Sequence, residues 1–331
     1  MIKEGAVRTS SKAAAAVALG FVLTAVFAAP GIAGAPNCRG DSISVHDLAS
    51  GCHGGSGVIA LDDGRTFAVP AAGVTLTAAP VAEGDTDPGD VVIANRGAAG
   101  IAVQVDEVWA GSPTAVRQER AAQQRRTLGA TIRGTVSHGG ATTSASCGSK
   151  AYVLTGAHWE SPVRWRYNPS GAKVSNVAAI QRGAEAWTGT ITACGQTVRS
   201  TAAQEYLGTA TQQPAVTADG GCGTSNRTSV IGWGKLPSKT LALTCIWSFT
   251  DGVAFETDQR YSTSHRWGST STCSGNRFDL RGIATHEWGH SYGLGHTAQK
   301  SGLVMKPSST VCDTAQRTLG LGDVRGIAAL Y

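Results

Sequence analysis

The chain has 331 residues, of which 41% are apolar and 15% are charged, so it can bury the core of one large domain or two ordinary ones. Glycine is abundant, with 43 residues, and aromatic residues make up only 6%, which favours strands and loops over a helical bundle. The formal net charge is +5, and +2 of it lies in the first twelve residues (Lys3, Arg8 and Lys12 against Glu4). A charge this small does not indicate a nucleic-acid partner.

Residues 1–35 are typical of a signal peptide. A basic start, MIKEGAVRTSSK, precedes AAAAVALGFVLTAVFAA, a stretch of 17 residues without a charge, and AGA at 33–35 matches a small-residue cleavage site. Cleavage a few residues earlier is an alternative, and an uncleaved membrane anchor is another. The apolar stretch is short for a membrane span. We therefore expect a secreted, extracellular protein without membrane contact after cleavage.

All eight cysteines follow this segment. An even number in an exported chain predicts disulfides, and the absence of a C-x-x-C pair argues against a cysteine zinc site. Eight cysteines allow about 105 connectivities, and the sequence does not select one. The simplest hypothesis joins neighbours, namely Cys38 to Cys52, Cys147 to Cys194, Cys222 to Cys245, and Cys273 to Cys312.

Two sequence blocks with a linker between them follow the signal. Residues 36–112 contain short alternating stretches such as GVIAL, GVTLTA and DVVIA, which predict a small β-rich N-terminal module. Residues 113–146 are first basic and then rich in Gly, Ser and Thr, which indicates a short helix or coil followed by a linker. A domain boundary is expected there.

From residue 147 the chain has the pattern of an α+β domain that extends to residue 331. VRWRYN, SVIGWGKL and TLALTCIWSF predict strands. SNVAAIQRGAEAWTG predicts a helix with Ser175 as its N-cap, and FDLRGIATHEWGHSYG predicts a second helix capped by Asp279. LGDVRGIAALY predicts a short amphipathic helix at the end.

The segment HEWGHSYGLGH, residues 286–296, contains the candidate metal ligands and the candidate general base. His286 and His290 are four residues apart, so both imidazoles lie on one face of a helix, where two neutral rings can bind one Zn²⁺. Glu287 is placed to reach past the metal to its bound water, whose pKa falls to about 7. A carboxylate in that position can act as general base while the water attacks a carbonyl.

A third ligand is needed, with one position left for water. Gly293 can adopt a positive φ and end the helix, so that the chain turns back and His296 completes the set. H-E-x-x-H alone arises by chance in unrelated proteins, but the added glycine and third histidine make coincidence a poor explanation. We expect one catalytic Zn²⁺ at this site.

This segment resembles the metzincin metallopeptidases, which share the form H-E-x-x-H-x-x-G-x-x-H and a methionine turn beneath the metal. Met305, nine residues after His296, is placed for that turn. FDLRGIATHEWGHSYGLGH and VMKPS look most like the matrixin branch, peptidase family M10, and Pro307 stands where other branches have a tyrosine ligand. The resemblance covers about residues 150–331. It implies an α+β catalytic domain with a twisted mixed sheet, three helices and a substrate cleft, and a substrate pocket lined by Lys306, Pro307, Ser308 and Ser309.

The chain departs from the matrixin pattern in two respects. The cysteine-switch motif P-R-C-G-x-P-D of matrixin pro-regions is absent, and His138, His158 and His265 are too scattered to assign a second zinc. Asp251, Glu256 and Asp258 are candidates for Ca²⁺ binding, with ordinary surface carboxylates as the simpler interpretation. The excess of Arg over Lys, 20 to 8, with abundant Ala and Gly, is typical of a bacterial origin.

The sequence therefore predicts a secreted zinc-dependent endopeptidase, a monomer that hydrolyses protein or peptide substrates with a zinc-bound water activated by Glu287. A non-catalytic extracellular binding protein with a zinc fold, and a zinc hydrolase of another amide such as a cell-wall bond, are the alternatives. Residues 36–146 are expected to form a removable pro-region, with a permanent accessory domain as the rival. Such a pro-region would cover the cleft, or a side chain such as His46 or His53 would reach the zinc.

Overall fold

The computed structural model describes residues 38, 42–52, 56–133 and 145–331 of the chain. The predicted signal peptide, His53, His138 and residues 134–144 of the predicted linker lie outside these described residues. Within the described part, no helix combines the length and the apolar character that a membrane crossing requires.

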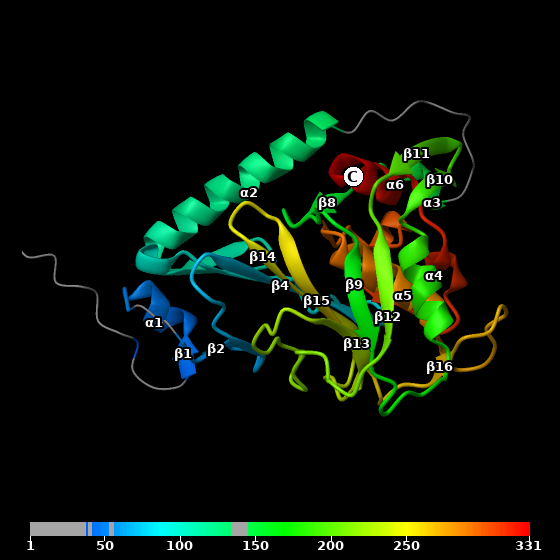
Figure 1. Ribbon diagram of the computed structural model, residues 1–331, viewed down its shortest axis with the longest axis horizontal. Helices are drawn as coiled ribbons and strands as arrows, with labels where there is room; N and C mark the ends of the chain where they lie inside the picture. Colours follow the sequence, from blue (N-terminus) through cyan, green and yellow to red (C-terminus); the bar gives the residue numbers. More distant parts are fainter. Residues whose placement is uncertain (1–37, 39–41, 53–55, 134–144) are drawn as a thin grey trace, which may run out of the picture. The chain divides into compact units, whose positions relative to one another are not determined.

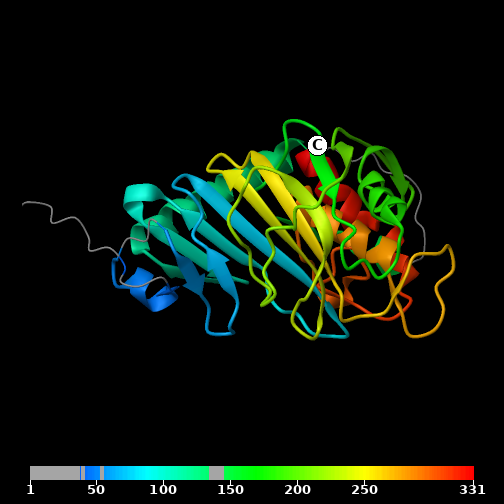
Figure 2. The same cartoon turned by 60° about the horizontal axis from the view of Figure 1, so that its bottom comes forward.

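A mixed sheet of ten strands runs through the described residues (Figures 1 and 2). Its strands follow the order β12-β9-β13-β15-β14-β4-β5-β6-β7, and β19 pairs with β4 outside that path. Neighbours from β12 to β15 are parallel, those from β15 to β7 are antiparallel, and β19 runs parallel to β4. The strands are β4 (Val74–Glu83), β5 (Val91–Asn95), β6 (Ile101–Val105), β7 (Val108–Gly111), β9 (Val163–Tyr167), β12 (Gln204–Thr209), β13 (Ser229–Gly234), β14 (Thr240–Phe249), β15 (Ala254–Ser262) and β19 (Ser308–Ser309).

The remaining strands form four small sheets. They are the three-stranded sheet of β1 (Ser42–Ser44), β2 (Val58–Ala60) and β3 (Thr66–Ala68), and the pairs β10 (Gly189–Ala193) with β11 (Gln196–Ser200), β16 (Trp267–Gly268) with β17 (Phe278–Asp279), and β18 (Leu294–Gly295) with β8 (Val153–Leu154). The last pair matters for the site because β18 lies between two of the predicted zinc ligands in the sequence.

Three helices of nine or more residues follow residue 147 in the described part of the chain: α4 (Val177–Glu185), α5 (Leu280–Ser291) and α6 (Leu321–Leu330). Gly183 allows α4 to pack closely on α5, because a Cβ at that position would lie 2.7 Å from the backbone of Ala284. The cap of α4 differs from the predicted one. Asn176, not Ser175, accepts the hydrogen bond from the Ala179 N–H, at 3.2 Å, because the helix begins one residue later than expected.

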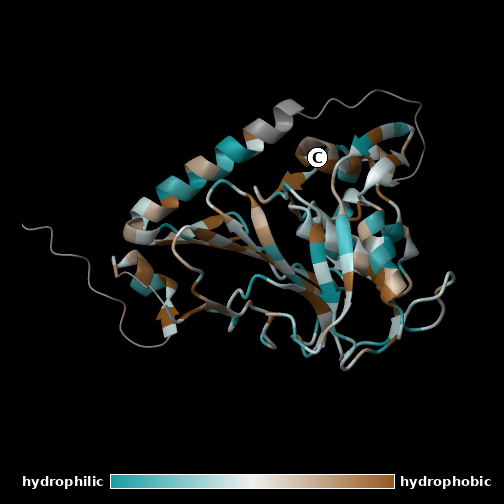
Figure 3. Ribbon diagram, in the orientation of Figure 1, coloured by the Kyte–Doolittle hydropathy of each residue, from teal (hydrophilic) through white to brown (hydrophobic). Residues whose placement is uncertain are grey.

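Short helices and turns complete the chain. They are α1 (Val45–Ala49), α3 (Ala145–Gly148) and the 3-10 turns η1 (Gly97–Ala99), η2 (Gln299–Ser301) and η3 (Thr314–Arg317). The longest helix, α2 (Pro113–Arg133), occupies most of the segment for which we expected a short helix or coil and then a linker. It is largely hydrophilic (Figure 3), and it lies against β6, β7 and α6.

The two faces of the sheet are buried in different hydrophobic clusters. One cluster joins α4, α5 and α6 to the sheet and includes Trp165, Trp187 and Trp288. The other lies on the opposite face, where β1, β2 and β3 pack against the sheet, and includes Phe67 and Trp247. Because β4 is covered on both faces, nine of its ten residues are buried and only Glu83 is exposed.

The N-terminal block and the predicted catalytic domain share this sheet. Strands β4 to β7 come from residues 74–111, and β4 pairs along its length with β14. The boundary predicted near residues 113–146 thus separates two stretches of sequence but not two sheets. Through the pairing of β4 with β14, the N-terminal block lies next to the strand whose Thr244 contacts Glu287.

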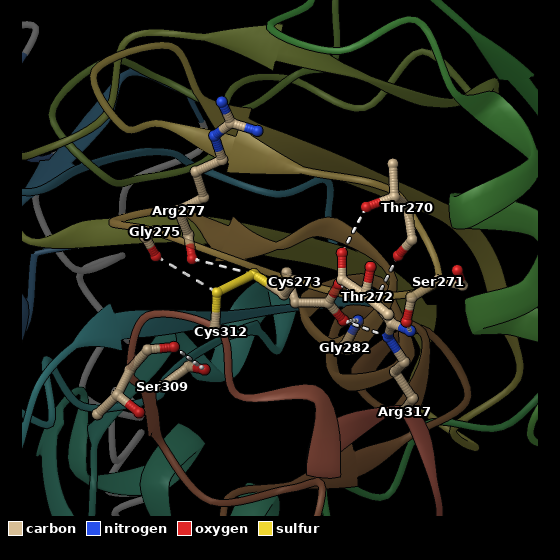
Figure 4. Close-up of a disulfide and its surroundings, with 12 residues drawn as sticks. Thr270, Ser271, Thr272, Cys273, Gly275, Arg277, Gly282, Ser309, Cys312 and Arg317 are labelled. Carbon is tan, nitrogen blue, oxygen red and sulfur yellow. Dashed lines mark hydrogen bonds and ion pairs between the residues drawn. A yellow bond between two sulfur atoms is a disulfide. The ribbon is translucent and has the colours of Figure 1, made fainter.

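The four disulfides join neighbouring cysteines, which confirms the simplest hypothesis from the sequence. Cys273–Cys312 links the loop before α5 to the segment after Met305 (Figure 4). Beside it, the Arg317 guanidinium donates hydrogen bonds to the backbone oxygens of Thr270 and Ser271, and its ion pair with Asp279 reaches the cap of α5. This corner of the fold therefore fixes the start of the helix that carries the histidines.

Candidate metal centre

Helix α5 presents two of the predicted zinc ligands on one face. The helix begins after Asp279, whose side chain accepts a hydrogen bond from the Gly282 N–H at 2.7 Å and caps the first turn as predicted. His286 and His290 follow one turn apart, and their Nε2 atoms lie 2.8 Å from each other.

His296 joins them because the chain reverses at Gly293. The helix ends at Ser291, and Gly293 has a φ of +101°, a conformation that glycine adopts easily. A Cβ there would also lie 2.0 Å from the Ala157 oxygen, so both the backbone angle and the space require glycine. The turn brings His296 Nε2 to 3.2 Å from His286 Nε2 and 3.1 Å from His290 Nε2.

The three nitrogens have the arrangement that a tetrahedral metal needs. Nitrogens about 2.0–2.1 Å from a tetrahedral Zn²⁺ lie about 3.4 Å from one another. The observed separations of 2.8–3.2 Å are slightly tighter and of the same size. Within the described part of the chain, these histidines are the one group of three or more metal-capable side chains that comes together. They could bind a metal ion.

Each imidazole is held from its other nitrogen. A contact at Nδ1 fixes the orientation of the imidazole ring, so its Nε2 points in a defined direction. Contacts of this kind commonly orient histidines that bind a metal. The Nδ1 contacts are His286 to the Val304 oxygen at 2.7 Å, His290 to the Leu294 oxygen at 2.8 Å, and His296 to Asp90 Oδ1 at 2.9 Å.

Burial sets the protonation of this cluster. It lowers the pKa of His286 well below its usual range and that of His290 to about 3, so both rings are neutral, the form that binds metal. Burial also lowers the pKa of His296, but the Asp90 carboxylate outweighs it and the net shift is upward. For Asp90, burial opposes ionisation, and the contact with His296 prevails and lowers its pKa to about 2.

Glu287 is buried beside the histidines. Its Oε2 accepts a hydrogen bond of 2.5 Å from the Thr244 hydroxyl on β14, whereas its Oε1 has no hydrogen-bond partner among the described residues. Burial raises the pKa of Glu287 well above its usual range, and the Thr244 hydroxyl opposes that shift. One carboxylate oxygen is thus anchored, and the other is left available to a molecule that enters the site.

Met305 packs against α5. A Cβ on Gly289 would lie 2.2 Å from the Met305 sulfur, so the helix and the methionine can approach this closely only because residue 289 is glycine. Asp323 on α6 stabilises the turn that contains Met305 by hydrogen bonds to its backbone. Its carboxylate accepts the backbone N–H groups of Val304 and Met305 at 2.9 and 3.3 Å.

The predicted substrate-pocket residues lie just after this turn, and they contact the N-terminal block. Ser308 and Ser309 form β19, which pairs with β4, and the Pro307 oxygen accepts a hydrogen bond from the Ala82 N–H at 3.0 Å. The Lys306 ammonium pairs with Asp313 at 2.5 Å.

The carboxylates considered for calcium are not arranged for it. Glu256 and Asp258 are fully buried, so they are not surface carboxylates either. Asp258 accepts hydrogen bonds from two backbone N–H groups, and Glu256 accepts two more together with one from the Ser225 hydroxyl. Asp251 is exposed. These oxygens already have donors as partners, which leaves them poorly suited to a cation.

Three residues that contact the site, Thr244, Asp90 and Asp323, were not predicted from the sequence. Thr244 stood in a predicted strand, and only its polarity among apolar neighbours marked it. Asp90 and Asp323 have no local signal, because Asp90 acts on a histidine 206 positions away and Asp323 on a turn 18 positions away.

Comparison with known proteins agrees with this geometry. Residues 237–331, which include the three histidines and Met305, match the matrixin family model of the M10 peptidases. Neutrophil collagenase from Homo sapiens is 31% identical over 84 residues, which is 25% of this chain and 17% of that protein. Matrix metalloproteinase-20 from Homo sapiens is 33% identical over 84 residues, 25% of this chain and 16% of that protein. The chain thus spans about a sixth of the length of these relatives. The comparisons support a matrixin-like family for its C-terminal part, and with it a function of the metallopeptidase type.

Proposed function

We propose that the protein is a secreted zinc endopeptidase that cleaves extended segments of protein or peptide substrates. The observation that carries the proposal is the convergence of three Nε2 atoms beside a carboxylate, one oxygen of which has no hydrogen-bond partner in the described part of the chain. Zinc, when bound there, would act as a Lewis acid that lowers the pKa of water and polarises a carbonyl. The matrixin family is zinc-dependent, and its model matches the segment that holds these residues.

Glu287 performs the proton transfers in this proposal. Its Oε1 accepts the proton of the attacking water, and the same oxygen then delivers it to the amine that leaves. Thr244 donates a 2.5 Å hydrogen bond to Oε2. This bond holds the orientation of the carboxylate between the two proton transfers. A binding protein would not need this carboxylate.

The predicted export signal and the disulfides support secretion. Disulfides persist in oxidising compartments, and four are present. Residues 36–146 remain, in this proposal, a pro-region whose removal gives the mature enzyme. N-terminal sequencing of protein from culture medium tests this, and a start between about residues 113 and 150 is expected, whereas fully active enzyme that starts near residue 30–36 contradicts it.

Digestion of a denatured protein mixture tests the peptidase proposal. Wild type and Glu287→Gln are incubated with the mixture before and after limited trypsin treatment that is stopped with inhibitor, and new termini are mapped by mass spectrometry. We expect defined internal cuts from the trypsin-treated wild type, lost on chelation and absent from Glu287→Gln. Identical termini from both proteins, or none from either, would contradict an endopeptidase. Release of cell-wall amides without any peptide cleavage would favour the other hydrolase.

A further inference from the structure

The inner part of the site is closed in the described structure, whereas His296 is partly buried and lines a cavity. His286, Glu287 and His290 have no exposed surface, and neither does Thr244 on β14. An endopeptidase must admit a polypeptide to such residues. Whatever covers them therefore stands where a substrate has to enter.

Strand β4 of the N-terminal block lies at this position. It pairs antiparallel with β14, with Thr244 opposite Ala79 and Ile246 opposite Thr77 (Figure 1). Since Thr244 bonds directly to Glu287, the middle of β4 runs past the strand that holds the proposed catalytic carboxylate. Without β4, β14 would be an edge strand with unpaired backbone groups on that side.

The other edge of β4 pairs with β5 in its first half, and its last residues are bound by the segment that follows Met305. β4 is parallel to β19, with Ser308 opposite Ala82 and Ser309 opposite Glu83. The Ala82 N–H donates to the Pro307 oxygen at 3.0 Å, and the Gly84 N–H donates to the Ser309 oxygen at 2.9 Å. Thus β4 is held on both sides through its backbone, the way in which an extended peptide is bound irrespective of its sequence.

The side chains of β4 on the α5 side are small. Val81 belongs to the same buried cluster as Met305 and Trp288, and Thr77 lines a cavity with Asp90 and His296. Ala79 lies between Val81 and Thr77 on this face, because side chains alternate along a strand, and it is completely buried. A larger or charged side chain at position 79 would therefore have to displace buried neighbours.

Asp90 gives the same block a second contact with the site. It precedes β5, and its carboxylate lies 2.9 Å from the Nδ1 of His296 while it accepts the His296 backbone N–H at 3.4 Å. The strand and the carboxylate approach the proposed metal centre from one continuous segment, residues 74–90. His46, a candidate from the sequence for contact with the zinc, is not among the side chains gathered there.

We propose that β4 occupies the place of a substrate strand between β14 and β19, so that the chain keeps its own site closed until this segment is withdrawn. The inference rests on the proposed peptidase function for its biological meaning, but the covering of the site can be measured without any cleavage reaction.

The test weakens β4 and measures access to zinc. The full-length zinc-loaded chain is mixed with the chromogenic chelator 4-(2-pyridylazo)resorcinol, and the rate of zinc transfer is recorded beside cleavage of a short fluorogenic peptide. Ala79→Glu places a charge at a completely buried position, which disfavours the packed position of β4. We expect both rates to rise about tenfold or more. Ala71→Glu makes the same change at an exposed position before β4 and should behave as the wild type.

A milder variant covers the case in which Ala79→Glu does not fold. Val81→Ala shortens a buried side chain of β4 and should raise the zinc-transfer rate about tenfold, since loss of buried methyl groups weakens packing by this order. Equal transfer rates for wild type and Val81→Ala, or an intact wild type that cleaves peptide as fast as the variants, would overturn the proposal. Faster transfer without peptide cleavage would support the covering by β4 and contradict the peptidase function instead.

Discussion

Asp323 offers a quantitative test of how the site is supported. Its fully buried carboxylate accepts three backbone N–H groups, those of Val304 at 2.9 Å, Met305 at 3.3 Å and Gly320 at 2.8 Å. The first two belong to the turn at Val304 and Met305, and the Val304 oxygen also contacts the Nδ1 of His286. Replacement of Asp323 by alanine would leave three buried donors without acceptors.

Each donor left unpaired costs about 1–3 kcal/mol, and water that enters the vacated space recovers part of it. We therefore expect Asp323→Ala to lower the free energy of unfolding by about 3–6 kcal/mol, a large share of the 5–15 kcal/mol of a typical domain. Urea unfolding followed by tryptophan fluorescence measures the change. Asp62→Ala, at an exposed carboxylate, should change stability by less than about 0.5 kcal/mol. A loss below about 1 kcal/mol for Asp323→Ala would refute the reasoning.

Three further predictions concern protonation, catalysis and the disulfide. Burial raises the pKa of Asp323 to about 6, so the folded chain holds a proton that the unfolded chain releases near pH 4. As the pH rises from about 4 to 6, urea unfolding should show the wild type losing about 2 kcal/mol relative to Asp323→Asn, and a constant difference would contradict this. Glu287→Gln should keep its zinc but lose about 10²–10⁴ in peptide turnover, and a wild-type rate with unchanged zinc content argues against a general base. Joint replacement of Cys273 and Cys312 by serine should cost about 4 kcal/mol in unfolding free energy, given their separation of 39 residues, and free thiols at both positions in a peptide map of the wild type would refute the bond.

The local features of the site could be predicted from the sequence because short-range geometry determines them. A spacing of four places His286 and His290 on one helical face, and a glycine is needed wherever the chain must turn with positive φ, as at Gly293. Asp279 was identified as the cap of α5 for the same reason, since it stands directly before the helical pattern. The four disulfides were correct because each joins cysteines adjacent in the sequence.

The long-range features could not be predicted in this way. GVTLTA indicated a strand, but no pattern within it identifies β14 as its partner, more than 150 residues later. The contacts of Asp90 with His296 and of Thr244 with Glu287 likewise arise only once the sheet is assembled. For the same reason, the sequence indicated a separate N-terminal module, whereas its strands complete the sheet that carries the site.

The central claim is that the three histidines hold a catalytic zinc ion. Zinc content per chain, measured by mass spectrometry of metals on proteins purified in parallel, tests it most directly. The account predicts one zinc per chain in the wild type and in Glu287→Gln, and none in the double variant His286→Ala/His296→Ala, with all three proteins folded by circular dichroism. Zinc retained by the folded double variant would contradict it.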